Sequence, residues 1–462
     1  MNKNRLIHLK DGQVNKNKTY VLYWMQQAQR VHYNHALDHA IQLANLYNLP
    51  VVCFFALDDA YPEANERSYA FMLEGLNEVK RLLSKLGITF LLKIGHPTET
   101  IKPYLKETQS LVMDRGYLKH QRAWRKDVYT YLKEDPYISI DMIDSDLIVP
   151  IHIASQKDEY GAYTLRPKLK KVFLEYRDFN QLTAVNDKKE VFFQKNDVKN
   201  DLLFLMNQLN IDKSVKKSLY YQGGYSEASK LFSTFIFDKS DQYPKSSDPS
   251  KNITSLMSMY LHYGQISSLE LLERLFVALE QGHIKGESFD QYIEQLLVRR
   301  ELAFNYVFYK KGYDRFETMT ETWAYQTMKA HEFDHKEYLY DIKDYEKFST
   351  HDLYFNAAMK QMVITGYMHN YMRMYWAKKI IEWSPSFEVA YKNILFLNNK
   401  YFIDGRDPNS YTGVAWCFGK HDRAWTERKI FGKLRYMNDK GLERKFDIKA
   451  YVDQMNELSS NS

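Results

Sequence analysis

The sequence predicts an α/β domain with a doubly wound parallel sheet, followed by an all-α domain. In the first third of the 462 residues, short apolar runs alternate with amphipathic stretches at the spacing of strand, helix, strand units. A polar segment of mixed charge then extends from about Leu182 to Asp212, and the pattern after it is helical almost to the end. A chain of this length suggests two or three domains, each with its own core.

Five strands are expected in the α/β domain. Their ranges are Tyr20–Trp24, Val51–Leu57, Ile88–Ile94 and Leu111–Met113, with a fifth around Ile143–Val149. Helical patterns fill the gaps between them, most clearly from Asn34 to Leu46 and from Arg67 to Leu86. Because strands that alternate with helices form parallel sheets, a doubly wound sheet is the simplest fold for this part.

The domain boundaries follow from the changes in pattern. We expect the α/β domain to span residues 17–183, a linker to span 184–218, and the helical domain to span 219–460. One further polar loop, Asp238–Asn252, interrupts the helical part and contains two prolines.

One helix of the second half is expected from about Met359 to Trp383. Apolar residues recur there in steps of three and four, and the pattern stops at Ser384 and Pro385, where proline would break a helix. Trp376 and Trp383 are seven residues apart and therefore share a face, where core packing is the ordinary interpretation.

The composition excludes several classes of protein. With 45% hydrophobic and 26% charged residues, the chain is neither disordered nor of low complexity. No run approaches the roughly 18 apolar residues of a membrane span, and the N-terminus lacks the apolar core of a signal peptide. Cys53 and Cys417 fit reduced core thiols. We therefore expect a soluble, cytoplasmic protein, with a monomer as the default state.

The segment from Trp416 to Lys445 is rich in basic and aromatic residues, although the net charge of the whole chain is only +6. It carries nine Lys or Arg against four acids, with aromatic residues among them. Basic side chains neutralise phosphates and rings stack on bases, so this composition favours a nucleic-acid groove; a solvated helix surface is the alternative. The candidate contacts are Trp416, Lys420, Arg423, Arg428, Lys429 and Arg435.

A formal zinc motif is present but lies in unsuitable surroundings. His331, Glu332 and His335 fit H-E-x-x-H, the spacing that places two imidazoles on one helix face with the glutamate as base. The flanking residues are charged at nearly every turn and indicate neither an apolar face nor a third ligand. A zinc hydrolase is therefore a minor alternative, and we expect no metal site.

Two segments of the helical half are candidates for binding a cofactor, since the α/β part lacks the glycine-rich nucleotide motifs. Thr254, Ser255 and Ser258 place hydroxyls at the start of a helical run, which suits a phosphate but also plain helix capping. The loop Asp404–Asn409 is charged within an apolar region, and its charges need partners, of which Arg373 could be one.

Five stretches of the sequence resemble the class II cyclobutane pyrimidine dimer photolyases, of the photolyase and cryptochrome family. They are YVLYWMQQAQRVHYNHAL near the N-terminus, YLHYGQIS (260–267), VRRELAFNY (298–306), YMRMYWAKKIIEW (371–383) and DGRDPNSYTGVAWCFGKHDRAW (404–425). The resemblance covers nearly the whole chain, and it implies the photolyase/cryptochrome fold, in which the second domain is an all-α FAD-binding domain.

The resemblance implies a light-driven DNA repair enzyme, a deoxyribodipyrimidine photo-lyase. One reduced FAD per chain would donate an electron to a flipped-out pyrimidine dimer and receive it back, and a second antenna chromophore of unknown identity is possible. The implied cofactor-binding residues are Ser255, Met257, Ser258, Arg373, Asn398, Asp404, Arg406 and Asp407. The implied catalytic residues are Glu301, Met374, Asn398 and Trp416, with Trp376 and Trp383 as an electron relay. DNA containing pyrimidine dimers is the implied partner, and no membrane is involved.

One departure from the family pattern affects the relay. Where the family reads LWNA, this chain has YFNA, so that Phe355 replaces a tryptophan that would carry electrons to the flavin. Nearby tyrosines such as Tyr354 could substitute for it. We therefore hypothesise that photoreduction of oxidised FAD is slow or rerouted. Met259 and Tyr263 replace a proline and a phenylalanine, as packing changes.

Two other functions remain open at this point. A blue-light signalling flavoprotein of cryptochrome type would keep the flavin and lose repair, but Glu301 and Trp416 are both present. A light-independent nucleic-acid-binding protein would explain the basic, aromatic segment without using Arg373, Asp404 or Asn398.

Overall fold

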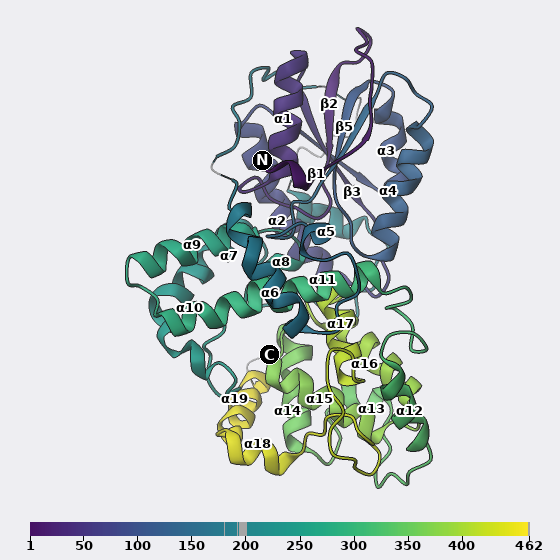
Figure 1. Ribbon diagram of the computed structural model, residues 1–462, viewed down its shortest axis with the longest axis vertical. Coiled ribbons are helices and arrows are strands. Elements are labelled where there is room, and N and C mark those ends of the chain that lie inside the picture. Colours follow the sequence, from purple (N-terminus) through teal and green to yellow (C-terminus); the bar gives the residue numbers. More distant parts are fainter. Residues whose placement is uncertain (180, 192, 194–200, 461–462) are drawn as a thin grey trace.

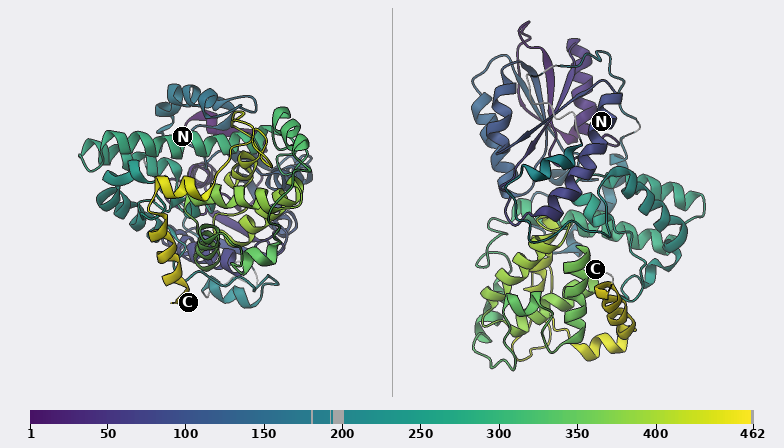
Figure 2. Two further views of the ribbon diagram at one scale, coloured as in Figure 1. Left: turned by 90° about the horizontal axis from the view of Figure 1, so that it is seen from below. Right: turned by 180° about the vertical axis from the view of Figure 1, so that it is seen from behind.

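The computed structural model describes residues 1–179, 181–191, 193 and 201–460. An α/β domain lies at one end of the molecule and the later helices lie at the other, as Figures 1 and 2 show. This is the α/β and all-α arrangement that the sequence predicts. None of the helices in the described ranges is long and apolar enough to cross a membrane.

The α/β domain contains one six-stranded sheet in the order β1-β6-β5-β2-β3-β4. Strands β2 to β6 are parallel, and β1 pairs antiparallel with β6. The bounds are β1 Leu6–Lys10, β2 Tyr20–Trp24, β3 Val51–Leu57, β4 Thr89–Ile94, β5 Thr108–Asp114 and β6 Ser139–Ile143. The predicted strand around Ile143–Val149 is wrong, because β6 ends where that prediction begins; β1, short and half-exposed, was not predicted.

Helices cover both faces of the sheet, as a doubly wound fold requires. Alternate residues of β2 point to opposite faces: Val21 packs in one apolar cluster with α1 (His35–Tyr47) and α2 (Glu66–Lys85). Leu22 packs in the other cluster with α3 (Pro97–Leu105) and α4 (Lys119–Leu132). The predicted helices at 34–46 and 67–86 agree with α1 and α2 to within one residue at each end.

Helices that follow the sheet form the rest of the molecule. Among the described residues they are α5 Ile151–Ala154, α6 Ala162–Val172, α7 Tyr225–Thr234, α8 Met257–His262, α9 Ser268–Glu280, α10 Gly286–Ile293, α11 Arg300–Tyr309, α12 Thr322–Ala330, α13 Ile342–Glu346, α14 Leu353–Thr365, α15 Asn370–Trp383, α16 Phe387–Tyr401, α17 Pro408–Cys417, α18 Asp439–Lys445 and α19 Ile448–Ser460. Helix α6 packs in the same apolar cluster as α9 and α10, so the chain joins the helical part before the polar segment begins.

The helix predicted from Met359 to Trp383 is two helices, α14 and α15. Helix α14 ends at Gly366, whose φ of 85° is the left-handed conformation that favours glycine at a helix C-terminus. The His369 side chain then caps the start of α15 by accepting the Tyr371 N–H. The periodicity missed this break because the apolar face continues through it.

The two polar segments also contain more structure than predicted. Part of the predicted loop at 238–252 is helical, as a π-turn at Phe235–Lys239 and a 3₁₀ turn at Ser240–Lys245. In the predicted linker, residues 192 and 194–200 lie outside the described residues. The 3₁₀ turn Leu202–Asn207 packs its leucines in the same apolar cluster as α2. The sequence did not predict this, because a few spaced leucines do not stand out in a segment of polar composition.

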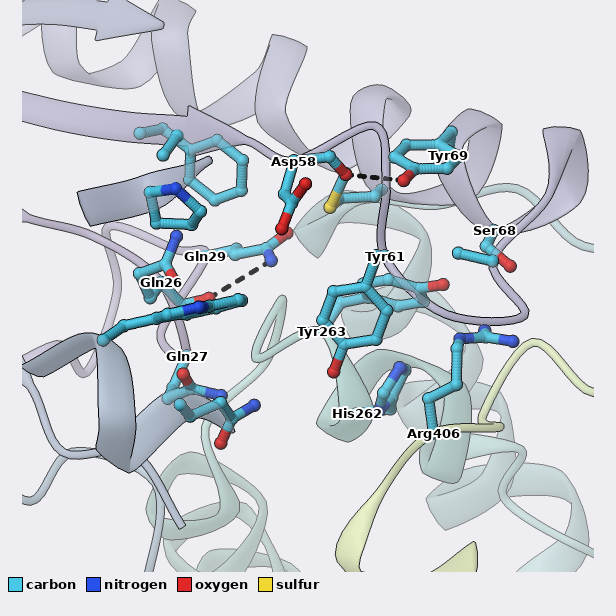
Figure 3. A pocket seen from close by; sticks show the side chains of 17 residues that line it. Gln26, Gln27, Gln29, Asp58, Tyr61, Ser68, Tyr69, His262, Tyr263 and Arg406 are labelled. Carbon is cyan, nitrogen blue, oxygen red and sulfur yellow. Dashed lines mark hydrogen bonds between the residues drawn. The ribbon is translucent and has the colours of Figure 1, made fainter. Parts of the chain in front are cut away.

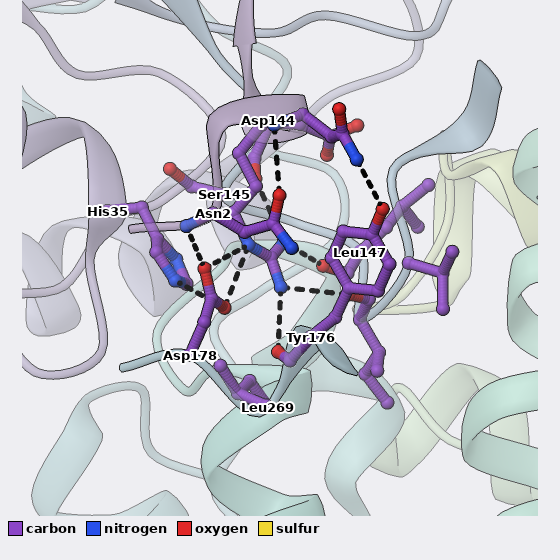
Figure 4. A network of polar contacts seen from close by, with 12 residues as sticks. Asn2, His35, Asp144, Ser145, Leu147, Tyr176, Asp178 and Leu269 are labelled. Atoms are coloured by element: carbon purple, nitrogen blue, oxygen red, sulfur yellow. Dashed lines mark hydrogen bonds and ion pairs between the residues drawn. The ribbon is translucent and has the colours of Figure 1, made fainter. Parts of the chain in front are cut away.

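A buried arginine, Arg5, fastens the loop that follows β6. Figure 4 shows the polar network that includes its partners Leu147, Tyr176 and Asp178. The Arg5 side chain is 0% exposed and donates to the carbonyl oxygens of Leu147, Ile148 and Tyr176 at 2.8, 2.8 and 3.1 Å. Its Nε lies 3.1 Å from the Asp178 carboxylate. The network therefore joins the N-terminal residues, the loop after β6 and the segment after α6 at one place.

Candidate functional site

A cavity of about 560 Å³ lies within the helical half. Helices α8, α15, α16 and α17 line it, together with the loop Asp404–Asp407 and the start of α11. Most of the predicted site residues line it: Ser255, Met257, Ser258, Arg373, Met374, Trp376, Asn398, Asp404, Asp407 and Trp416. The structure thus brings together residues from four segments, of which the first and the last, at Ser255 and Trp416, are 161 positions apart in the sequence.

Arg373 and Asp404 form a two-pronged ion pair on the cavity wall. The Arg373 Nη1 and Nη2 atoms lie 3.0 and 3.1 Å from the two carboxylate oxygens, and Nε donates to the Met368 carbonyl at 2.9 Å. The guanidinium carbon lies 4.0 Å from the Phe402 ring centroid. These contacts hold a positive charge at a fixed position beside the cavity.

Asp407 and His262 form a second polar pair. Asp407 caps α17 by accepting the Asn409 N–H, and its other oxygen lies 3.0 Å from His262 Nδ1. Burial acts to raise the pKa of Asp407, but the hydrogen bonds with His262 and Asn409 outweigh it and hold the pKa below its ordinary value. Asp407 is therefore ionised and anchored at neutral pH.

The hydroxyl-rich segment lies at another part of the wall. Leu256 has a φ of 61°, which turns the chain sharply before α8 begins at Met257. Ser255 Oγ and the Tyr292 hydroxyl are 2.8 Å apart, and the Ser258 side chain is exposed toward the cavity. Hydroxyls and free amides at this turn can donate hydrogen bonds to an anionic group.

Glu301 is buried beside the cavity, but it is not one of the cavity-lining residues. Its Oε1 atom accepts the backbone N–H groups of Ile148 and Val149 at 2.7 and 3.2 Å, within the loop that Arg5 holds. Burial raises the pKa of Glu301 to about 8 although these two amides act in the opposite direction. The carboxyl therefore carries a proton at neutral pH, and its contact with a lesion stays a prediction.

Arg406 points away from the residues with which it was predicted to act. Its Nη1 donates to the Asn399 carbonyl, and its side chain lines a different cavity. The left-handed φ of 62° at Arg406 accounts for this direction, because it turns the loop between Asp404 and Asp407. The predicted contact of Arg406 with the same cofactor as Arg373 does not fit this geometry.

The two relay tryptophans lie on one face of α15, and both are buried. Trp376 Nε1 lies 2.9 Å from the Met359 sulfur on α14. The Trp383 ring centroid is 5.1 Å from that of Phe355, one turn earlier on α14. Tyr354, the suggested substitute, instead donates to Glu443 at 2.7 Å. The space beside the two tryptophans is therefore filled by Phe355 and Met359.

The basic segment has an exposed part and a buried part. Arg423, Arg428 and Lys429 are exposed. The guanidinium carbon of Arg299 lies 5.4 Å from the Trp416 ring centroid. Arg435 is half-buried beside Asp422, at 3.6 Å. These residues extend from the cavity to the surface. Arg299 belongs to the stretch VRRELAFNY, from which sequence reasoning took only the glutamate.

Lys420 was predicted to bind DNA, and its place in the structure corrects that prediction. It is 1% exposed, and its ammonium lies 2.8 and 2.7 Å from the carboxylates of Asp158 and Glu321. A lysine that is neutralised by two acids inside the protein cannot also neutralise a phosphate at the surface.

The H-E-x-x-H motif does not lie on a helix. Helix α12 ends at Ala330, and the His331 ring contacts Asp334 at 2.7 Å and Glu427 at 3.0 Å. Within the described ranges, no group of three or more histidine, cysteine or acidic side chains has the geometry of a metal site. The two histidines therefore do not converge as the motif would require.

A second cavity, of about 110 Å³, lies at the carboxyl ends of β2 and β3 (Figure 3). It is lined by Gln26, Gln27, Gln29, Phe55, Ala56, Asp58, Tyr61, Ala64, Ser68, Tyr69, Met72, Pro97, Gln121, Trp124, His262, Tyr263 and Arg406. The Arg406 Nη2 atom is buried and has no hydrogen-bond partner among the described residues. Sequence reasoning missed this cavity, although the change of direction in the strand order between β2 and β5 is a general signal for one.

Comparisons with known proteins agree on one family. The family model described as DNA photolyase matches residues 21–187. The deoxyribodipyrimidine photo-lyase of Methanothermobacter thermautotrophicus is 42% identical over 449 residues, with 95% of each chain covered. That of Arabidopsis thaliana is 36% identical, with 95% of this chain and 89% of the relative covered.

Solved structures show the same fold at low sequence identity. A class III photolyase from Agrobacterium tumefaciens superposes with a TM-score of 0.72 at 17% identity, covering 95% of this chain and 86% of its own. An archaeal photolyase from Sulfolobus tokodaii, described with two FAD molecules, gives a TM-score of 0.68 at 15% identity, covering 94% and 90%.

Proposed function

Because the chain belongs to the photolyase/cryptochrome family, we propose that it is a class II photolyase that repairs cyclobutane pyrimidine dimers in DNA with light. Its enzyme class is that of the deoxyribodipyrimidine photo-lyases. The single observation that carries the proposal is the 560 Å³ cavity, which is lined both by the residues implied for the flavin and by Trp416. The electron-transfer mechanism and the type of dimer are part of this proposal.

The residues of the cavity fit FAD. The turn at Ser255 and Ser258 offers hydroxyls and amides for the diphosphate, and Asn398 lines the same cavity, with its Nδ2 donating to Asn399 Oδ1. The Arg373 charge, held by Asp404, would stabilise the anionic form of a reduced flavin bound in this cavity. When bound and fully reduced, FAD supplies a light-excited electron donor.

The rest of the cavity would receive the lesion. A pyrimidine dimer stacks and pairs poorly, which reduces the cost of turning it out of the duplex, a few kcal/mol for an intact base. Trp416 and Met374 line the cavity and offer apolar surfaces on which such a base can stack. Glu301 would hold a proton near the lesion, on the carboxyl whose pKa burial raises to about 8.

The exposed part of the basic segment would bind the DNA backbone. Arg423, Arg428 and Lys429 are exposed and would neutralise phosphates around the extruded nucleotides, and Arg435 lines the cavity itself. We keep the division into residues 17–183, 184–218 and 219–460 as a proposal. A cytoplasmic monomer is proposed in the same way.

The second cavity is the proposed place of an antenna chromophore. Tyr61, Trp124 and Tyr263 give it aromatic walls, and the unpartnered Nη2 of Arg406 would attract a negatively charged group. The Sulfolobus tokodaii photolyase is described with two FAD molecules and the implication of a novel light-harvesting cofactor, which supports a second site of this kind.

The absorption spectrum of the purified protein, before and after denaturation, tests the proposal. We expect release of about one FAD per chain, followed by light-dependent loss of dimers from irradiated DNA; the same mixture in the dark is the control. A colourless protein that takes up no added FAD would refute the proposal. Flavin without repair would instead indicate a signalling function.

A further inference from the structure

Two neighbouring lysines of α15 have opposite surroundings. Lys379 lies 2.9 Å from the Glu382 carboxylate and 3.9 Å from that of Asp352, so its charge is neutralised. Lys378 is 3% exposed, and among the described residues no carboxylate lies within ion-pair distance of it. Its ammonium donates to the Cys417 carbonyl at 2.5 Å and lies 5.9 Å from the Phe431 ring centroid.

Lys378 also lines the 560 Å³ cavity, together with Trp416, Asp422 and Arg435. Its amine is thus buried, lacks a counter-ion and borders the space that we assign to nucleotides turned out of DNA. Burial lowers the pKa of Lys378 to about 8, while Arg435 acts in the same direction and Asp422 in the opposite one. About a tenth of such an amine is neutral at pH 7, far more than for an ordinary lysine.

We propose that Lys378 is the nucleophile of a second, light-independent activity on abasic sites in DNA. The inference rests on the proposed function, since it needs the cavity to admit an extruded nucleotide. An abasic nucleotide has no base to unstack or unpair, so it is among the least costly to extrude. In its open form it carries an aldehyde at C1′, the group with which a neutral lysine amine forms a Schiff base.

The reaction is balanced without an oxidant or a reductant. The Lys378 nitrogen attacks C1′, and loss of one water leaves a protonated imine. The proton at C2′ then passes to the Asp422 carboxylate, and the C3′–O bond breaks, so that the 3′ phosphate leaves with the bonding electrons. Water hydrolyses the remaining imine, which releases the unsaturated aldehyde and restores the lysine.

Borohydride trapping tests this inference on the flavin-containing protein. A duplex with one abasic site is incubated with the protein in the dark and treated with borohydride, which reduces an imine to a stable amine. We expect a covalent protein–DNA adduct that maps to Lys378 by mass spectrometry. Lys378→Arg keeps the charge but removes the nucleophile and should lose the adduct, whereas Lys379→Arg should retain it.

Dimer repair in the same preparations separates this inference from the function proposed above. If the wild-type protein repairs dimers under light but gives no adduct, the second activity is refuted and the photolyase proposal stands. An adduct that persists in Lys378→Arg, or that maps to another residue, also refutes the role of Lys378. If neither repair nor an adduct is found, both proposals fail. An unchanged circular dichroism spectrum and thermal midpoint show that Lys378→Arg is folded.

Discussion

The rings of Phe355 and Trp383 meet edge to face, with their centroids 5.1 Å apart and their planes at 69°. Trp376 lies seven residues before Trp383 on α15, which corresponds to about 10.5 Å of helix rise. Its contact on α14 is the Met359 sulfur rather than another ring. In the proposed relay, a phenylalanine that packs against Trp383 therefore stands where an oxidisable ring would be needed between the two tryptophans.

Phe355→Trp should accelerate photoreduction of oxidised FAD. Tryptophan is oxidised more readily than phenylalanine, so the new ring would shorten the electron-transfer step between Trp376 and Trp383. Transient absorption with a thiol donor measures the rate, and we expect slow reduction in the wild-type protein. Because Phe355 is fully buried, the larger ring should also cost about 1–3 kcal/mol of stability.

Phe355→Trp combined with Trp383→Phe is the matched control for this variant. It keeps the new ring and removes the outer end of the relay, so the gain in rate should disappear. Rapid, Trp376-dependent reduction in the wild-type protein would contradict the hypothesis about Phe355.

Asp404→Asn should lower the FAD content. The substitution leaves the Arg373 guanidinium without its counter-ion, so we also expect the free energy of unfolding to fall by about 2 kcal/mol. This is less than for a fully buried pair, because the Arg373 side chain is 24% exposed. Released FAD per chain and the thermal midpoint measure the two effects. Glu388→Gln breaks the exposed pair with Lys392 and should change neither. An unchanged FAD content in Asp404→Asn would contradict the assigned role.

Glu301→Gln should reduce the pH dependence of stability. In the folded chain the carboxyl keeps its proton up to a pKa of about 8, against an ordinary value of 4.5 in the unfolded chain. Between these values the folded chain holds more protons, so the free energy of unfolding falls as the pH rises, by up to about 1.4 kcal/mol per unit. Urea unfolding of the wild-type protein and of Glu301→Gln at pH 5.5 and 7.5 measures the difference. If the free energy of unfolding changed equally with pH in the two proteins, the effect of burial on Glu301 would be contradicted.

Arg428→Gln should weaken binding of DNA and reduce its salt dependence. An exposed arginine that contacts a phosphate releases about one counter-ion, so the slope of log affinity against log salt should fall by about 1. Fluorescence anisotropy at several salt concentrations measures the slope. Lys420→Gln, which removes a buried, paired lysine, should lower the thermal midpoint and leave the slope unchanged. If Lys420→Gln lowered the slope and Arg428→Gln did not, the DNA would not bind along the exposed part of the basic segment.

Strands β2 to β5 and the first two helices could be predicted because each is a local pattern. Strand β3 is seven buried apolar residues, and α1 begins where the Asn34 side chain accepts the Leu37 N–H. The break between α14 and α15 could not be predicted from periodicity, because it depends on the backbone of one glycine, Gly366.

The candidate site was predicted as a set of residues but not as a geometry. Resemblance selected Arg373, Asn398 and Asp404, and the structure places them around one cavity. The resemblance could not show that Lys420 is buried, because the two acids that neutralise it lie about 100 and 260 residues away in the sequence. A basic residue can be recognised in a sequence, but its exposure depends on partners that only the fold brings near.

The Arg5 network makes Asn2 and Arg5 part of the structure that positions the loop after β6. The backbone N–H of Asn2 donates to Asp178 at 2.5 Å, beside the Arg5 guanidinium that holds the loop after β6. That loop in turn presents the two amides that Glu301 accepts. Removing the first five residues would therefore disturb a carboxyl beside the cavity that lies about 300 positions further along the sequence.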